Sequence, residues 1–309
     1  LPRPCIRILV CHKPLTGFSR PLFDAETGRC GSIIAPLQPP IPYSSRPGSM
    51  QGWTLVTTMN PQEQERYSRQ IKLPQVGNHG QQRLLDAQAL IIGMGGLGSP
   101  VALYLASAGI GRLTITDFDR VDESNLQRQV IHRQEMIGEL KAESARNAIE
   151  RLNPQCMVEA LDYELDGEEL LERVGGADVV VDCTDNFPSR FELNNASLAT
   201  GTPLVSGAAI RWEGQVVTFH PRDSKSPCYR CLYPDTGIEA ATCAMEGVIA
   251  PIVGVIGTLQ ALETLNVLLE TGKGLSGRVM VFDGIAMEWQ TISLPRNPDC
   301  PACTQRPTY

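Results

Sequence analysis

A short apolar run followed by a glycine-rich turn constrains this chain more than any other feature. Residues 89–92 lead directly into GMGGLGSP, residues 93–100, whose glycines Gly93, Gly95, Gly96 and Gly98 include the spacing G-x-G-x-x-G. A strand that enters such a turn and continues as a helix presents backbone N–H groups to a phosphate at the helix N-terminus. Asp117 follows the next expected strand, where an acidic side chain binds ribose hydroxyls. The pattern predicts a nucleotide site.

Apolar runs alternate with helical periodicity from residue 89 onward. We expect strands at 112–116, 158–161, 177–183, 204–208, 215–219, 278–282 and 287–294, and helices at 61–71, 80–87, 97–108, 139–152, 166–173, 187–199 and 247–269. This order predicts an α/β fold: a Rossmann-like, doubly wound, mostly parallel sheet with an antiparallel C-terminal extension. Ligands bind beyond the carboxyl ends of such strands, where Asp117, Asp185 and Asn186 fall.

The chain divides into two parts by composition. Residues 1–49 hold nine prolines and six basic side chains but only two acidic ones, without strand or helix periodicity. We interpret residues 1–59 as a disordered or artefactual extension and residues 60–309 as one domain. A net charge of −7 and 42% hydrophobic residues favour a cytoplasmic protein that binds neither nucleic acid nor membrane. The longest apolar run, 248–259, is too short to span a bilayer.

Four of the ten cysteines form two C-x-x-C pairs, Cys228 with Cys231 and Cys300 with Cys303. This spacing favours a tetrahedral structural zinc site over disulfides. Such a zinc ion would join the C-terminal strands to the segment around residue 230, as a zinc-stapled insertion. Free cysteines or a redox pair are the alternative.

The stretch Ser124-Asn125-Leu126-Gln127-Arg128-Gln129 follows the second strand of the nucleotide fold, and Lys141 begins the next helix region. Arg128 and Lys141 together would neutralise a triphosphate, whereas a dinucleotide needs less positive charge. Either side chain alone would be interpreted as solvated surface charge.

These motifs together resemble the MoeB/ThiF family, the bacterial relatives of ubiquitin-activating enzymes. The resemblance rests on SNLQRQ, on the glycine loop, on DCTDN at 182–186 and on the paired C-x-x-C motifs, and extends from about residue 66 to 303. It implies that ATP binds in the glycine loop and that the enzyme adenylates the C-terminal glycine of a small ubiquitin-like sulfur carrier ending in Gly-Gly, releasing pyrophosphate.

The resemblance also implies roles for single residues. Asp117 would bind the ribose, and Ser124, Asn125, Leu126, Gln127, Arg128 and Lys141 would line the phosphates. Asp185 would hold Mg²⁺ with Asn186 beside it. No catalytic histidine is expected, since the attacking carboxylate is already ionised at neutral pH.

Three further expectations come from the resemblance. Arg69, in the stretch RYSRQ, would reach the ATP of a partner subunit, which implies a homodimer. Cys243 would become covalently linked to the carrier, and an unreactive loop cysteine is the alternative. The segment 237–243 would order over the carrier's tail.

The identity of the carrier stays open. GAAIRWEGQV at 207–216 and DFDRVDESNLQRQ at 117–129 favour the carrier of molybdopterin synthase, whereas CYRCLYPD at 228–235 and VFDG at 281–284 favour the carrier of thiazole synthesis. An NAD-dependent oxidoreductase and a non-catalytic carrier-binding protein are alternatives of other classes. SNLQRQ, Lys141 and the lack of a placed proton donor argue against the oxidoreductase. The complete set of Asp117, Asn125, Arg128, Lys141 and Asp185 argues against the non-catalytic protein.

Overall fold

The computed structural model describes residues 59–233, 246–272 and 274–309. The expected N-terminal extension, apart from Met59, lies outside these ranges. The expected carrier-covering loop at 237–243, with Cys243, also lies outside them.

One eight-stranded sheet forms the centre of the described chain, in the order β3-β2-β1-β4-β5-β6-β7-β8. In this sheet order, the five strands β3, β2, β1, β4 and β5 pair in parallel. The strands from β5 through β6 and β7 to β8 pair antiparallel. This confirms the doubly wound sheet with its antiparallel extension. The strands are β1 (Gln88–Ile92), β2 (Arg112–Thr116), β3 (Met157–Leu161), β4 (Val179–Asp182), β5 (Leu204–Ile210), β6 (Glu213–Phe219), β7 (Arg278–Asp283) and β8 (Glu288–Ser293).

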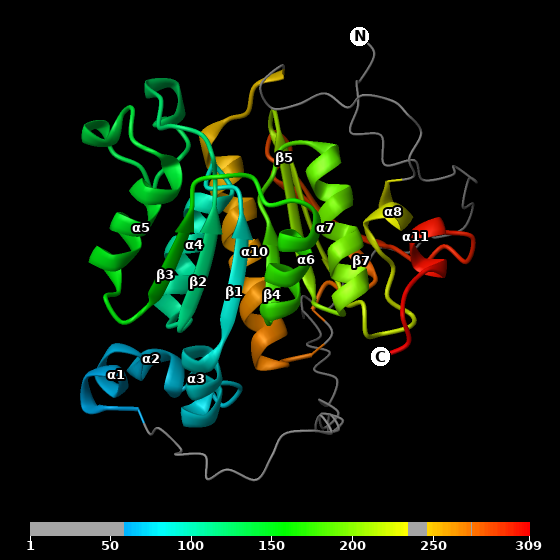
Figure 1. Ribbon diagram of the computed structural model, residues 1–309, viewed down its shortest axis with the longest axis horizontal. Helices are drawn as coiled ribbons and strands as arrows, with labels where there is room; N and C mark the ends of the chain where they lie inside the picture. The colour runs from blue at the N-terminus through cyan, green and yellow to red at the C-terminus, as the bar shows by residue number, and fades with distance from the viewer. Residues whose placement is uncertain (1–58, 234–245, 273) are drawn as a thin grey trace, which may run out of the picture. The chain divides into compact units, whose positions relative to one another are not determined.

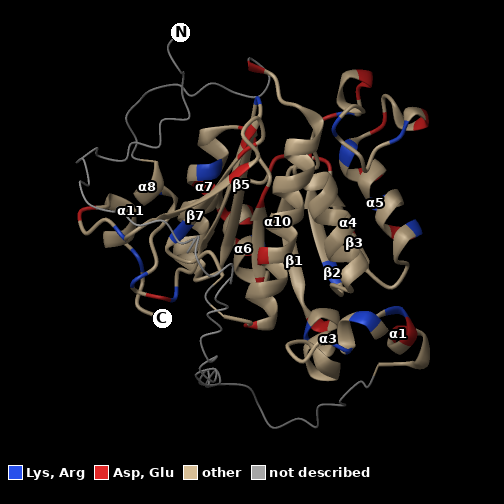
Figure 2. Ribbon diagram, turned by 180° about the vertical axis from the view of Figure 1, so that it is seen from behind, with Lys and Arg blue, Asp and Glu red and all other residues tan. Residues whose placement is uncertain are grey.

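Helices cover both faces of the sheet (Figures 1 and 2). One face carries α4 (Gly98–Ala108), α5 (Lys141–Leu152) and α10 (Ala250–Leu269), and the other carries α6 (Gly167–Gly176) and α7 (Phe187–Thr200). The helices α1 (Pro61–Arg66), α2 (Ser68–Ile71) and α3 (Gly77–Asp86) lie near the amino ends of the parallel strands. The short helices α8 (Tyr229–Leu232) and α11 (Pro301–Thr304) lie beside each other. Both signs of charge occur on α5 and on α1–α3 (Figure 2).

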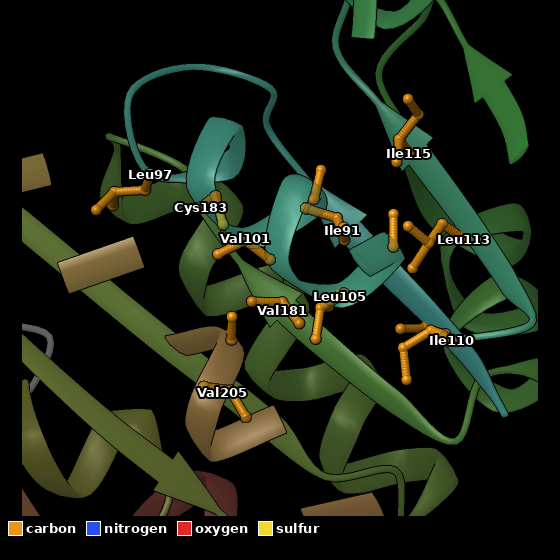
Figure 3. Close-up of a cluster of buried hydrophobic side chains, with 14 of the residues drawn as sticks. Ile91, Leu97, Val101, Leu105, Ile110, Leu113, Ile115, Val181, Cys183 and Val205 are labelled. Carbon is orange, nitrogen blue, oxygen red and sulfur yellow. The ribbon is translucent and has the colours of Figure 1, made fainter. Parts of the chain in front are cut away.

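The main core lies between the sheet and the helices on the face that α4 covers (Figure 3). Ile91 from β1, Val181 from β4 and Leu105 from α4 are fully buried in it. Burial of one such side chain contributes about 1.5–3 kcal/mol. The central strands are apolar on both faces because helices cover both, so β4 has no exposed residue.

Several helix boundaries differ from expectation by one to three residues, and two of the differences have a clear physical reason. The expected helix at 61–71 is interrupted at Tyr67, whose buried hydroxyl accepts a hydrogen bond from Asn153 at 2.9 Å. The expected helix from 247 begins only at Ala250, because Gly247 has φ +75° and Val248 bridges to Arg211. The short helices α8, α11, Glu123–Asn125 and Gln134–Met136 were not expected.

Among the described residues, α10 alone is long and apolar enough to span a bilayer by length and composition. Half of its most apolar window is buried, and the helix packs against α4 and β5. That environment is typical of the core helix of a globular domain.

Candidate functional site

The glycine loop joins β1 to α4 and packs tightly against its own protein. A Cβ at Gly98 would lie 1.9 Å from the Gly93 carbonyl oxygen, and a Cβ at Gly93, where φ is +94°, would lie 2.9 Å from the Cys183 carbonyl oxygen. A Cβ at Gly96 would lie 3.0 Å from Val253 on α10. Gly95 differs, since its nearest neighbour would be Gln129 Nε2 at 3.6 Å. Three glycines therefore serve the fold, and Gly95 leaves room on the outer side of the loop.

Asp117 is placed by the glycine loop. Its Oδ2 accepts a hydrogen bond from the Met94 backbone N–H at 2.8 Å, and its Oδ1 accepts one from the Asp119 N–H at 2.9 Å. Burial raises the pKa of Asp117, and the nearby Lys141 ammonium opposes that shift. The carboxylate is thus held at the end of β2, next to the loop.

Lys141 is a buried cation at the same end of the sheet. Its Nζ lies 2.7 Å from Asp119 Oδ2 and 4.0 Å from Asp117 Oδ1, and only 7% of its side chain is exposed. A buried ammonium needs such compensation. Sequence reasoning missed Asp119, although its place two residues after Asp117 was a usable signal.

The 3₁₀ turn Glu123–Asn125 begins the SNLQRQ stretch. Asn125 Oδ1 accepts a hydrogen bond from the Asp122 N–H at 3.3 Å, and Arg128 donates to the Ser124 carbonyl at 3.1 Å. Ser124 and Gln127 are exposed, and Leu126 is half-buried. These contacts order the stretch from within.

Gln129 also belongs to this region and was not expected at the site. It is 4% exposed, and its Oε1 has no hydrogen-bond partner among the described residues. Such an orphan acceptor beside Gly95 is typical of an incomplete polar site.

The buried side chain of His132 holds the glycine loop by a hydrogen bond to its backbone. His132 Nε2 lies 3.0 Å from the Met94 carbonyl, and its Nδ1 lies 2.9 Å from the Ser144 hydroxyl. Since a carbonyl can only accept, Nε2 carries the proton and Nδ1 accepts from Ser144. Burial lowers the pKa of His132, which keeps it neutral. His132 is therefore a satisfied core residue, as expected.

The DCTDN segment runs beside the glycine loop at the end of β4, where the Cys183 N–H donates to the Ile92 carbonyl at 2.9 Å. Buried Asp182 accepts from Ser206 at 2.6 Å and from the Thr184 hydroxyl at 2.7 Å. Asp185 is exposed, and no ion pair with it occurs in the described part of the chain. An exposed carboxylate at this position has the chemistry of an Mg²⁺ ligand.

Asn186 has a structural task at the same point. Its side chain caps α7 by accepting from the Ser189 N–H at 3.0 Å. That hydrogen bond orients the beginning of α7.

Arg69 does not join these residues within one chain. It is exposed on α2, and its neighbour Gln70 donates to the Ala108 carbonyl at 2.9 Å, at the C-terminal end of α4. The glycine loop lies at the other end of α4, on the order of 16 Å away at the rise of an α-helix.

The two C-x-x-C pairs come together. The four Sγ atoms of Cys228, Cys231, Cys300 and Cys303 all lie within 4.8 Å of one another. Neighbouring pairs are 3.6–3.9 Å apart. Four thiolates around one Zn²⁺ with bonds of about 2.3 Å require sulfur separations of about 3.8 Å. The residues therefore fit a closed structural zinc site.

The cluster also holds donors for charged sulfur. The Asn297 N–H donates to Cys231 Sγ at 3.5 Å, and Arg306 donates to Cys303 Sγ at 3.7 Å. Hydrogen bonds from Cys228 and from the Asn297 N–H lower the pKa of Cys231, which favours its thiolate. Cys156 and Cys183 lie apart from this cluster in the core, and burial raises the pKa of each.

Comparison with known proteins shows the family to which this chain belongs. Residues 67–302 match the model of the ThiF family. The chain belongs to the ThiF family. The molybdopterin-synthase adenylyltransferase of Escherichia coli K12 is 46% identical over 247 residues, which are 80% of this chain and 99% of that protein. The sulfur carrier protein ThiS adenylyltransferase of the same organism is 45% identical over 79% of this chain and 97% of that protein.

Solved structures agree with the fold. Escherichia coli MccB crystallised with ATP has a TM-score of 0.68 at 22% identity, over 80% of this chain and 75% of that one. The family match and the two relatives confirm the resemblance to the ThiF family, and the named relatives are adenylyltransferases.

Proposed function

We propose that this ThiF-family chain binds ATP at the glycine loop and adenylates the C-terminal glycine of a small ubiquitin-like sulfur carrier. The carrier's carboxylate attacks the α-phosphorus, and pyrophosphate leaves. The observation that carries this proposal is Lys141, a buried cation that faces two aspartates beside the loop. A triphosphate is a stronger partner for it than exposed Asp119.

Catalysis in this proposal consists of positioning and charge neutralisation. Lys141 and Arg128 offset the negative charge on the phosphates, with Asn125 and the backbone of residues 124–127 beside them. Asp117 accepts from the ribose hydroxyls, and Gly95 admits the phosphate chain. Asp185 is the residue that would hold Mg²⁺, with Asn186 beside it, and the ion would supply charge neutralisation at the phosphates.

The relatives leave two candidates for the carrier. The two Escherichia coli relatives, one for molybdopterin synthase and one for ThiS, match at 46% and 45% identity. We favour the molybdopterin carrier on the sequence motifs at 207–216 and 117–129, with the thiazole carrier as the second candidate. We further propose a cytoplasmic homodimer in which Arg69 serves the partner's site, and Cys243 as a thiol that acts on the carrier.

The test is exchange of radiolabelled pyrophosphate into ATP, with each carrier and with each carrier lacking its final glycine. We expect exchange only with one intact carrier. Lys141→Ala should lower the exchange rate about 10²–10³-fold, whereas Lys225→Ala, which changes an exposed lysine, should not. No exchange with either carrier, together with tight NAD binding, would overturn the proposal in favour of an oxidoreductase.

A further inference from the structure

Arg190 carries a buried guanidinium group that is not among the residues proposed to bind ATP, Mg²⁺ or zinc. It lies on the first turns of α7, directly after the DCTDN segment, and is 9% exposed. One of its amino groups, Nη2, donates to the Thr184 carbonyl at 2.5 Å and to the Gly207 carbonyl at 3.3 Å. Its Nε lies 3.8 Å from Asp182 Oδ2. The cation is thus buried behind the end of β4.

The other amino group contacts Tyr229, a residue of the first C-x-x-C segment. Nη1 donates to the Tyr229 hydroxyl at 3.3 Å, and Tyr229 stands between Cys228 and Cys231. Tyr229 is 1% exposed, and its backbone N–H donates to Asn194 on α7 at 2.8 Å. Any movement of the first C-x-x-C pair therefore moves an acceptor of Arg190.

The Thr184 carbonyl is the point at which this contact affects the candidate Mg²⁺ ligand. A peptide unit is planar, so the orientation of that carbonyl sets the orientation of the Asp185 N–H and the direction in which the chain enters Asp185. The Thr184 side chain and N–H are held from the other side by Asp182. Arg190 and Asp182 together define one conformation for this turn.

A buried cation must keep its acceptors, because an unmade hydrogen bond to a charged group is costly. Among the described residues, Arg190 Nε already lacks a hydrogen-bond partner. Loss of the Tyr229 hydroxyl would therefore cause the guanidinium to shift, and the Thr184 carbonyl that accepts from it would shift as well.

We propose that Arg190 is a positioning residue for Asp185 and that it couples the cysteine cluster, through Tyr229, to the metal-binding end of the nucleotide site. The inference rests on the proposed function for the role of Asp185. It assigns the C-x-x-C pairs a second task beyond joining the C-terminal strands: they set the Mg²⁺ requirement of the site.

The test uses Tyr229→Phe in the full chain. Tyr233→Phe is the matched control, because Tyr233 lies in the same aromatic cluster but its hydroxyl accepts from Gln215 at 2.6 Å instead of from Arg190. For both variants and the unaltered protein, three quantities are measured: bound zinc, the Mg²⁺ concentration for half-maximal pyrophosphate exchange, and amide hydrogen exchange at residues 183–187.

We expect Tyr229→Phe to keep its zinc while the half-maximal Mg²⁺ concentration rises about three- to tenfold, and the Asp185 amide to exchange faster. Tyr233→Phe should match the unaltered protein in both readouts. Equal Mg²⁺ dependence and equal amide exchange in the two variants would overturn the inference. If the unaltered protein shows no pyrophosphate exchange at all, the proposed function fails, and amide exchange alone then decides on the coupling.

Discussion

At the scale of single residues, the four loop glycines divide into three that the packing of the fold requires and one, Gly95, that the packing does not require and that we propose admits the ligand. A methyl group at Gly98 would overlap the Gly93 carbonyl, whereas at Gly95 it would meet only Gln129 at an ordinary contact distance. The same G-x-G-x-x-G spacing therefore contains two physical requirements. The sequence alone shows both as glycine.

Two substitutions separate these requirements. Gly98→Ala should lower the free energy of unfolding by about 1–3 kcal/mol or more, as overpacking does. Gly95→Ala should leave the free energy of unfolding nearly unchanged and should weaken ATP binding instead, because its Cβ would enter the space left for the phosphates. Denaturant unfolding and ATP titration of both variants measure the two effects. Equal loss of stability in both would contradict this division.

At the scale of elements, the carboxyl ends of β1, β2 and β4 bring together residues from distant parts of the sequence. Gly95, Asp117 and Asp185 meet because parallel neighbouring strands end at one edge of the sheet. The short helices α8 and α11 likewise bring together two cysteine pairs from distant parts of the sequence. Each helix has only four residues. Helices this short do not form alone, so tertiary contacts must hold them.

We therefore expect bound zinc to hold α8 and α11. The purified protein should contain one zinc ion per chain, and Cys300→Ser should lose it. Loss of the metal should also lower the melting temperature by on the order of 5 °C or more. Cys156→Ser is the control, because this cysteine is buried outside the cluster. Metal analysis and thermal unfolding decide; full zinc content in Cys300→Ser would contradict the four-cysteine site.

At the scale of the whole molecule, the position of Arg69 decides how many chains make one site. Arg69 lies at the amino ends of the strands, at the opposite end of α4 from the glycine loop. Within one chain it cannot reach a phosphate bound at that loop. If it contributes to catalysis, it does so in a second subunit.

A mixing experiment tests this arrangement. Arg69→Ala and Asp185→Ala should each abolish pyrophosphate exchange alone. If subunits re-assort in an equimolar mixture, half of the dimers combine the two variants and each of these has one intact site, so about a quarter of full activity should return. Mixing two preparations of Arg69→Ala is the control. No recovery in a mixture shown to contain the mixed dimer would contradict an active site shared between subunits.

The sequence by itself determined the architecture and the family. Strand and helix periodicity predicted the sheet, and DCTDN, SNLQRQ and the cysteine pairs identified the ThiF family, because these motifs are local and are read within a few residues.

Only the tertiary structure decided the features that depend on contacts between distant residues. The expected helix at 61–71 breaks at Tyr67, whose buried hydroxyl accepts a hydrogen bond from Asn153. Asp119 balances Lys141, and Arg190 connects Thr184 to Tyr229, through contacts between residues more than 20 apart or across elements. Burial and charge balance are properties of the packed chain, and no local pattern encodes them.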